Sequence, residues 1–181
     1  MQSYSPSLLA KVKKHLQGGG IIAYPTEFCS GFGCDPFNYT ALQRIIRLKG
    51  RAKNKGLIVI AGRLPQLSKL MITQPPELAE YWPGFYSLIL PVSPRAPSNL
   101  TGGKASIALR VSCHPLVQQL CYSLNMPLVS TSANKSGFKP LKSYRECQRQ
   151  FGNQVLVLPG HTSFSRHPSR IIDWESKTVL R

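Results

Sequence analysis

Short apolar runs that alternate with segments of helical periodicity constrain the fold of this chain more than any other feature. Helical patterns lie at 8–16, 40–49, 64–71, 76–81, 115–124 and 143–151, and runs suited to strands lie at 21–24, 57–61, 87–92, 106–112, 128–132, 155–158, 170–173 and 178–181. No helical segment separates 87–92 from 106–112, which favours antiparallel neighbours over a simple doubly wound sheet. We therefore expect an α/β fold with a twisted mixed parallel/antiparallel sheet and flanking helices. Residues 26–38, with Gly31 and Gly33, are expected to form a loop.

The length indicates one domain over residues 1–181, because 181 residues suffice for one substantial core and are too few for two ordinary ones. The chain shows no internal repeat, low-complexity segment or linker. Its five cysteines have no CxxC spacing, which disfavours a zinc site or a disulfide framework and favours a reducing compartment. The first residues carry no hydrophobic signal core, and no apolar run is long enough to span a membrane. We expect a cytoplasmic protein without a membrane partner.

Positive charge is large and unevenly distributed. The chain has 23 Lys and Arg against 7 Asp and Glu, a formal net charge of +16, and residues 36–76 and 81–145 contain no acid at all. Such a surface attracts polyanions, so nucleotide phosphates and RNA are both plausible partners, and we expect a basic concave groove. The charge alone leaves a generic solvated basic face open.

Two segments far apart in the sequence have the chemistry of a phosphate site. Lys49-Gly50-Arg51 ends a predicted helix, and 130–134, with the sequence Ser-Thr-Ser-Ala-Asn, follows an apolar run. Small hydroxyl and amide side chains leave room for ligand oxygens, and cations beside them would neutralise a polyphosphate. A helix C-terminus explains Lys49 by itself. It does not explain the alternation that continues through Lys53 and Lys55, so the pattern indicates a nucleotide site without a Walker-type glycine loop.

Thr26 and Arg110 are further candidates. Pro25 fixes the direction in which the first strand ends, so Thr26 would present its hydroxyl where ligands of α/β proteins bind, although an ordinary loop has the same pattern. Arg110 interrupts an apolar strand and has no acid near it in sequence. A buried arginine needs a partner, which favours a ligand carboxylate or phosphate over an unseen salt bridge, with an exposed edge strand as the alternative. His114 and Trp82 are interpreted as structural. No metal-ligand spacing or Ser-His-Asp pattern is evident.

Taken in order, these segments resemble the YrdC family of threonylcarbamoyl-AMP synthases in its short bacterial form. The matching pieces span almost the whole chain: 24–27 (YPTE), 31–36 (GFGCDP), 48–51 (LKGR), 55–60 (KGLIVI), 82–84 (WPG), 108–111 (ALRV), 114–117 (HPLV), 130–134 (STSAN), 159–160 (PG) and 168–173 (PSRIID). The most specific part is the paired signature Lys49/Arg51 and Ser132/Asn134. Residues 28–30, 85–87 and Arg170 depart from the family pattern.

The resemblance implies an enzyme that combines L-threonine, bicarbonate and ATP into threonylcarbamoyl-AMP and pyrophosphate, for the t6A modification of tRNA at position 37. It implies catalytic roles for Lys49 and Arg51, an ATP site of Lys49, Arg51, Lys55, Ser106, Ser132, Asn134 and Arg181, and a threonine site of Thr26, Arg110, Ser130 and Ser169. Mg²⁺ is expected with ATP, without a metal held by the protein. Further expected partners are a downstream threonylcarbamoyl-transferase complex and, weakly, tRNA. Two alternatives stay open: an RNA-binding or ribosome-maturation protein, and a carbamoyl-adenylate-forming domain with another acceptor.

Overall fold

Eight strands form one mixed sheet in the computed structural model, which describes residues 2–163 and 165–181. In spatial order they are β7 (Leu156–Val157), β1 (Ile22–Pro25), β2 (Ser30–Gly33), β6 (Leu128–Ser132), β3 (Ile58–Ala61), β5 (Ser106–Val111), β4 (Tyr86–Pro91) and β8 (Arg170–Asp173). The pairs β1–β7, β3–β5 and β4–β8 are parallel, and the remaining pairs are antiparallel. The predicted mixed sheet is confirmed, and β4 and β5 are antiparallel neighbours as their sequence proximity indicated.

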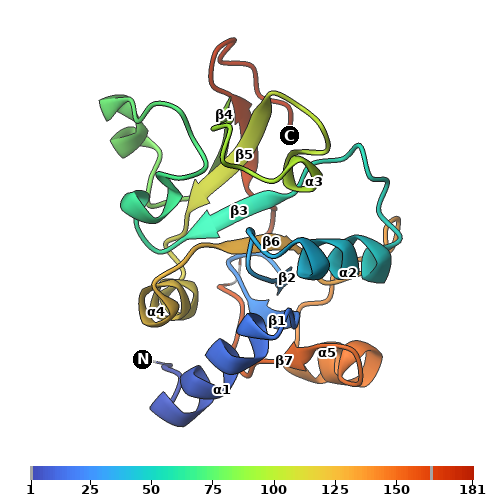
Figure 1. The fold of residues 1–181 in the computed structure, drawn as a ribbon. Coiled ribbons are helices and arrows are strands. Elements are labelled where there is room, and N and C mark those ends of the chain that lie inside the picture. The colour runs from blue at the N-terminus through green and yellow to red at the C-terminus, as the bar shows by residue number, and fades with distance from the viewer. Residues whose placement is uncertain (1, 164) are drawn as a thin grey trace.

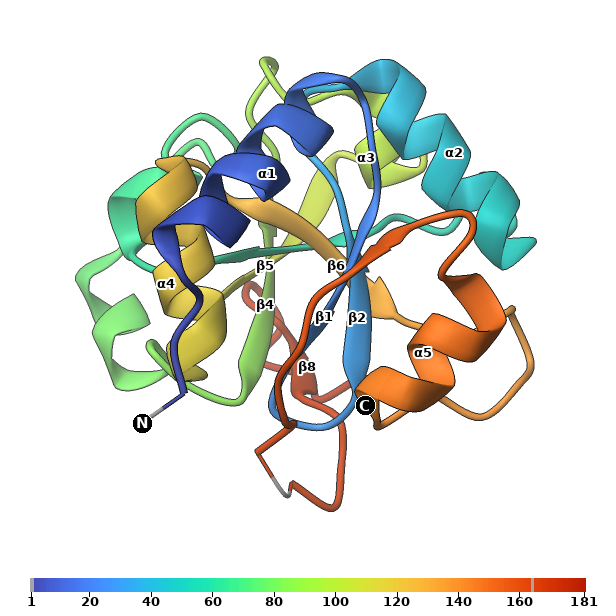
Figure 2. The same ribbon diagram turned by 90° about the horizontal axis from the view of Figure 1, so that it is seen from below.

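Helices cover both faces of this sheet (Figures 1 and 2). One face carries α1 (Pro6–Gln17) and α4 (Pro115–Leu124), and the other carries α2 (Tyr39–Lys49), α3 (Ser98–Thr101) and α5 (Tyr144–Phe151). Successive strand residues join different sides of the core, as alternation in a strand requires: Ile22 packs with α1 and α4, and Ala23 packs with α2 and α5. Within the described residues, no helix combines the length and apolar character needed to cross a membrane.

The end of α2 directs a basic segment out of the helical layer. The helix begins at an Asn38 cap, whose side-chain oxygen accepts a hydrogen bond of 3.0 Å from the amide of Ala41. It ends at Gly50, which has φ 58°, a left-handed conformation that glycine adopts without a side-chain penalty. The chain therefore reverses immediately after Lys49, and Arg51 leaves the helix in a new direction.

Two local predictions are wrong. The expected loop at 26–38 contains β2, which pairs with β1 and β6 in the interior of the sheet. The 178–181 run forms an isolated bridge from Val179 to Ile172 in place of a strand. The short helices expected at 64–71 and 76–81 are present as the 3₁₀ helices Leu64–Leu67 and Pro76–Glu80. In β2 the alternating apolar pattern is absent because packing requires glycine: a Cβ on Gly33 would lie 2.5 Å from the Tyr24 ring.

Candidate functional site

A cavity of about 480 Å³ lies over the middle of the sheet, on a row of residues that point to one face. The register aligns Ser130 of β6 with Ile58 of β3, and Ile58 with Ala108 of β5. Alternate residues of these strands line the cavity, as strand alternation requires, and Ile107 and Thr131 also reach it. Loops supply the walls, so the cavity combines a rigid floor with side chains from widely separated parts of the sequence: Thr26 after β1, Arg51 and Lys55 after α2, Lys104 before β5, Ser169 before β8, and Arg181.

The cavity lining is strongly cationic. Among the lining residues five carry positive side chains (Arg51, Lys55, Lys104, Arg110 and Arg181), and no aspartate, glutamate or histidine lines it within the described part of the chain. Clustered like charges are unfavourable without an anion, so this cationic lining suits a ligand with several negative charges. The donor set contains no carboxylate and therefore does not fit a protein-held Mg²⁺ ion, and no metal-holding group of His, Cys, Asp or Glu occurs among residues 2–163 and 165–181.

Arg51 is held at the cavity wall by its own loop. Its Nη2 donates to the carbonyl oxygen of Gly56 at 2.7 Å, and its Nε donates to that of Lys55 at 3.2 Å. Burial lowers the pKa of Arg51. Since carbonyl oxygens orient the guanidinium without neutralising it, the side chain keeps a full positive charge for an anionic ligand.

Lys49 and Asn134 lie behind the cavity wall and do not line it. The Lys49 side chain is 3% exposed, and its amine donates to the carbonyl oxygens of Ser132 and Asn134 and to Oδ1 of Asn134, the last two at 2.9 and 3.2 Å. Burial, with a smaller contribution from Arg51, lowers the pKa of Lys49 to about 8. The amide of Asn134 donates in turn to the carbonyl oxygens of Lys135 and Phe138. The two residues thus fix the end of β6, while Ser132 itself lines the cavity.

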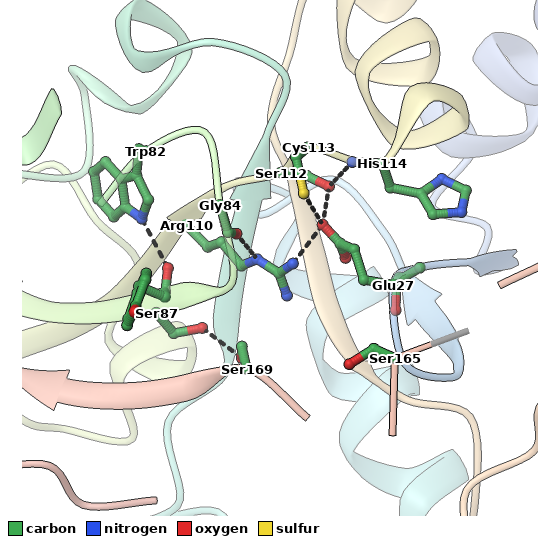
Figure 3. Close-up of polar contacts among 12 residues, drawn as sticks. Glu27, Trp82, Gly84, Ser87, Arg110, Ser112, Cys113, His114, Ser165 and Ser169 are labelled. Atoms are coloured by element: carbon green, nitrogen blue, oxygen red, sulfur yellow. Dashed lines mark hydrogen bonds and ion pairs between the residues drawn. The ribbon is translucent and has the colours of Figure 1, made fainter. Parts of the chain in front are cut away.

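Arg110 has an acidic partner, which corrects the inference that its charge awaits a ligand. Figure 3 shows Nη2 of Arg110 paired with Oε1 of Glu27, a residue far away in the sequence. The Nε of Arg110 donates to the carbonyl oxygen of Gly84 at 2.9 Å, and its guanidinium lies over the Phe85 ring. No hydrogen bond from Nη1 to the described residues is present, so this nitrogen is left for a ligand in the cavity that Arg110 lines.

The hydroxyl groups predicted for a threonine site share a cavity with Arg110, because Thr26, Ser130 and Ser169 all line it. The hydroxyl of Thr26 donates to the carbonyl oxygen of Cys29 at 2.7 Å, and that of Ser169 lies 2.9 Å from the hydroxyl of Ser87. Arg181 donates through Nε and Nη2 to the carbonyl oxygen of Ser169. Hydroxyl groups and one free guanidinium nitrogen are suited to the polar groups of a small amino acid.

Sequence reasoning missed three residues that shape the site: Lys104, Ser87 and Glu27. Lys104 lies in an acid-free segment directly after Gly102-Gly103, a signal that could have identified it. Ser87 gave no signal beyond its place at the start of a strand. Glu27 stands in the recognised 24–27 motif, yet only the fold brings it to Arg110. Conversely, His114 donates through Nε2 to the carbonyl oxygen of His161, at 3.1 Å, outside the cavity lining.

The chain is similar to a known protein family and to named proteins of several bacteria. The Sua5/YciO/YrdC family model, described as "Telomere recombination", matches residues 14–181. A protein of Methylobacillus flagellatus named threonylcarbamoyl-AMP synthase is 47% identical over 177 residues, which is 95% of this chain and 98% of that protein. A protein of the same name from Thiobacillus denitrificans is 46% identical, covering 92% and 91%.

Solved structures agree with this grouping. Pyrococcus abyssi Sua5 in complex with L-threonine superimposes with a TM-score of 0.88 at 28% identity, covering 99% of this chain and 55% of Sua5. The chain thus spans about half the length of that structure. Escherichia coli YciO has a TM-score of 0.86 at 23% identity, over 99% of this chain and 94% of YciO, which supports the fold alone.

Proposed function

The chain belongs to the Sua5/YciO/YrdC family, and from this membership we propose that it is a threonylcarbamoyl-AMP synthase. The reaction joins L-threonine, bicarbonate and ATP into threonylcarbamoyl-AMP and pyrophosphate, for the t6A modification at position 37 of tRNA. The observation that carries the proposal is the 47% identity to a protein of that name over 95% of this chain. The cavity supports it independently, since cations and hydroxyl groups line it together.

We assign the polyphosphate of ATP to the end of the cavity formed by Arg51, Lys55, Lys104 and Ser106. The loop of Lys55 and the loop of Lys104 meet there, since a Cβ on Gly102 would lie 2.9 Å from the amide nitrogen of Gly56. Ser132 and Arg181 line the same cavity and complete the proposed nucleotide contacts. Lys49 and Asn134 contribute through the backbone that they hold. Charge-assisted contacts of this kind hold phosphate oxygens more strongly than neutral hydrogen bonds do.

We assign L-threonine to the end formed by Thr26, Arg110, Ser130 and Ser169. One carboxylate oxygen would accept from Nη1 of Arg110, the guanidinium nitrogen without a bond to the described residues. The hydroxyl groups around it suit the amine and hydroxyl of threonine. This division places the amine between the carboxylate end and the phosphates, where carboxylation and adenylation both have to occur.

The proposed chemistry needs no nucleophile from the protein. Bicarbonate carboxylates the threonine amine with loss of water, and an oxygen of the resulting carbamate attacks the α-phosphorus of ATP. The bond from that phosphorus to the bridging oxygen breaks, and pyrophosphate leaves with the electron pair. Arg51 and the neighbouring cations stabilise the charge on the leaving group, so catalysis rests on positioning and electrostatics. Mg²⁺ would arrive with ATP as part of the substrate, because the lining offers it no carboxylate.

The partners beyond the small substrates follow from the same proposal. A threonylcarbamoyl-transferase complex would consume the product, tRNA would bind weakly, and the reaction would take place in the cytoplasm. Pyrophosphate release is the decisive measurement: it should require L-threonine and bicarbonate together, and it should proceed without tRNA. Release that is independent of threonine, or absent altogether with selective RNA binding in its place, would contradict the proposal.

A further inference from the structure

Glu27 is unusual for an acid in this chain, because it is wholly buried beside a cationic cavity that it does not line. The chain has only 7 acidic residues, and this one is 1% exposed. Its Oε1 pairs with Arg110 and accepts a hydrogen bond of 2.7 Å from the Ser112 hydroxyl (Figure 3). Burial of a carboxylate is costly, so the presence of this one next to a proposed substrate pocket suggests that its negative charge has a function there.

The remaining cations of the cavity have no such partner. Among the described residues, Arg110–Glu27 is the one ion pair, while Arg51 and Arg181 contact only carbonyl oxygens, which leave their charge intact. Arg181 is held at Ser169 and lies within electrostatic range of Arg110. Without Glu27, Arg110 would be an uncompensated cation close to the positive charge of Arg181, and the threonine end would itself attract phosphate.

The two ends of the cavity are far enough apart for charge to distinguish them. Ser106 and Arg110 are four residues apart on β5, which corresponds to about 13 Å along an extended strand. The cations around Ser106 have no acidic partner within the described part of the chain, whereas the carboxylate of Glu27 balances the charge of Arg110. A polyphosphate is drawn to the first end, and a zwitterion with no net charge is admitted at the second.

We propose that Glu27 is a specificity-determining residue that sorts the two substrates by charge. By neutralising Arg110, it keeps phosphate out of the amino-acid end while leaving Nη1 of Arg110 for a single carboxylate. The Ser112 hydroxyl holds Oε1 in this position and in turn accepts a hydrogen bond of 3.0 Å from the amide of His114. The inference rests on the proposed function, because it takes threonine and ATP as the two ligands.

Equilibrium dialysis tests this assignment directly. Binding of labelled L-threonine, and separately of a labelled ATP analogue, is measured against increasing inorganic phosphate, with ionic strength held constant by sodium chloride. In the wild-type protein, phosphate should displace the nucleotide at concentrations at least tenfold lower than those that displace threonine. In Glu27→Gln, phosphate should displace threonine at concentrations at least about tenfold below the wild-type value, because one unit charge has been removed from a water-poor site.

A matched control variant and a separate measurement on the wild-type protein make the test decisive. Ser112→Ala removes a hydrogen bond to the same carboxylate oxygen but keeps its charge, so it should retain the wild-type phosphate pattern. A folded Glu27→Gln protein that binds threonine with unchanged phosphate sensitivity would overturn the inference. Wild-type protein in which phosphate displaces threonine as readily as nucleotide would overturn it too, without reference to any variant. Wild-type protein that binds no threonine would instead overturn the proposed function, and this inference with it.

Discussion

Replacing Lys49 with methionine is expected to leave the chain folded and to impair its use of ATP. The amine donates to three acceptors at the end of β6, and the side chain is 3% exposed. Methionine fills a similar volume and donates nothing. The segment that carries Ser132 and Asn134 would then lose the anchor that fixes it against α2.

Two opposing effects set the stability of this variant. Hydrogen bonds to a charged group contribute about 1.5–3 kcal/mol each, and those of Lys49 would be lost. Against this, a pKa of about 8 in place of 10.5 means that the fold disfavours the charged amine by about 3 kcal/mol, and that cost would be relieved. Three bonds of this kind exceed the relieved cost, so we expect the free energy of unfolding to fall by about 1.5–6 kcal/mol, which lowers Tm by several degrees or more for a chain of this size.

The effect on ATP use should be separable from the effect on the fold. We expect kcat/KM for ATP, measured by pyrophosphate release at limiting ATP, to fall at least about tenfold, because the nucleotide end depends on positioning. Lys53→Met removes the same charge from an exposed position of the same segment and serves as the control. Wild-type turnover at limiting ATP in a folded Lys49→Met protein would refute the reasoning.

The remaining predictions concern pH, two arginines and RNA. The pKa of Lys49 is lowered to about 8, so between pH 8 and about 10.5 the unfolded chain keeps the Lys49 proton while the folded chain has lost it. The stability of the wild-type protein should therefore rise over this pH window relative to Lys49→Met in denaturant titrations. Over the same window kcat/KM for ATP should fall, because the deprotonated amine has one donor fewer for the end of β6. Arg51→Ala should lower kcat/KM for ATP at least about tenfold in steady-state assays, because a charge-assisted phosphate contact is lost; unchanged turnover would remove Arg51 from the site. Arg110→Lys should lose most threonine affinity by calorimetry, because an ammonium cannot serve Gly84, Glu27 and a ligand carboxylate together; unchanged affinity would make Arg110 structural. Binding to tRNA should collapse between roughly 50 and 200 mM salt, with little preference over unrelated RNA, and a selective complex at the higher salt in filter binding would favour the RNA alternative.

The sequence predicted those parts of the fold whose signal is local. Periodicity located α2 and α4 closely, and two successive apolar runs predicted the antiparallel pair β4–β5. The expectation that no helix separates these runs was wrong, because the short helix α3 lies between them. β2 carries no such signal: its Ser-Gly-Phe-Gly sequence is shaped by close packing against Tyr24, and not by alternation of apolar and polar residues. The run at 178–181 has a strand-like composition but exchanges only a few backbone hydrogen bonds with β8.

For the site, the sequence predicted which residues lie near the cavity better than it predicted which of them face into it. Arg51 and Ser132 line it, whereas Lys49 is turned onto the backbone of β6 by the end of α2. The direction of a long side chain depends on which strand packs beside its helix, and this information is absent from local sequence. The partner of Arg110 was missed for the same reason, because Glu27 meets it only after β1 and β5 have joined one sheet.

Most of the positive charge of the chain lies away from the cavity. The residues that attract RNA are therefore largely different from those that would bind ATP for adenylate formation. Five of the 23 Lys and Arg residues line the cavity, and its floor is the buried centre of the sheet. Cations away from the cavity act through a field that salt screens, whereas cations that line a cavity act on a ligand at contact distance, where screening is weaker. Rising salt should therefore release RNA from the cations away from the cavity before it displaces ATP from Arg51 and its neighbours. The net charge thus predicts attraction to polyanions in general, and the few charges around the cavity, with Glu27 among them, determine which anion is used.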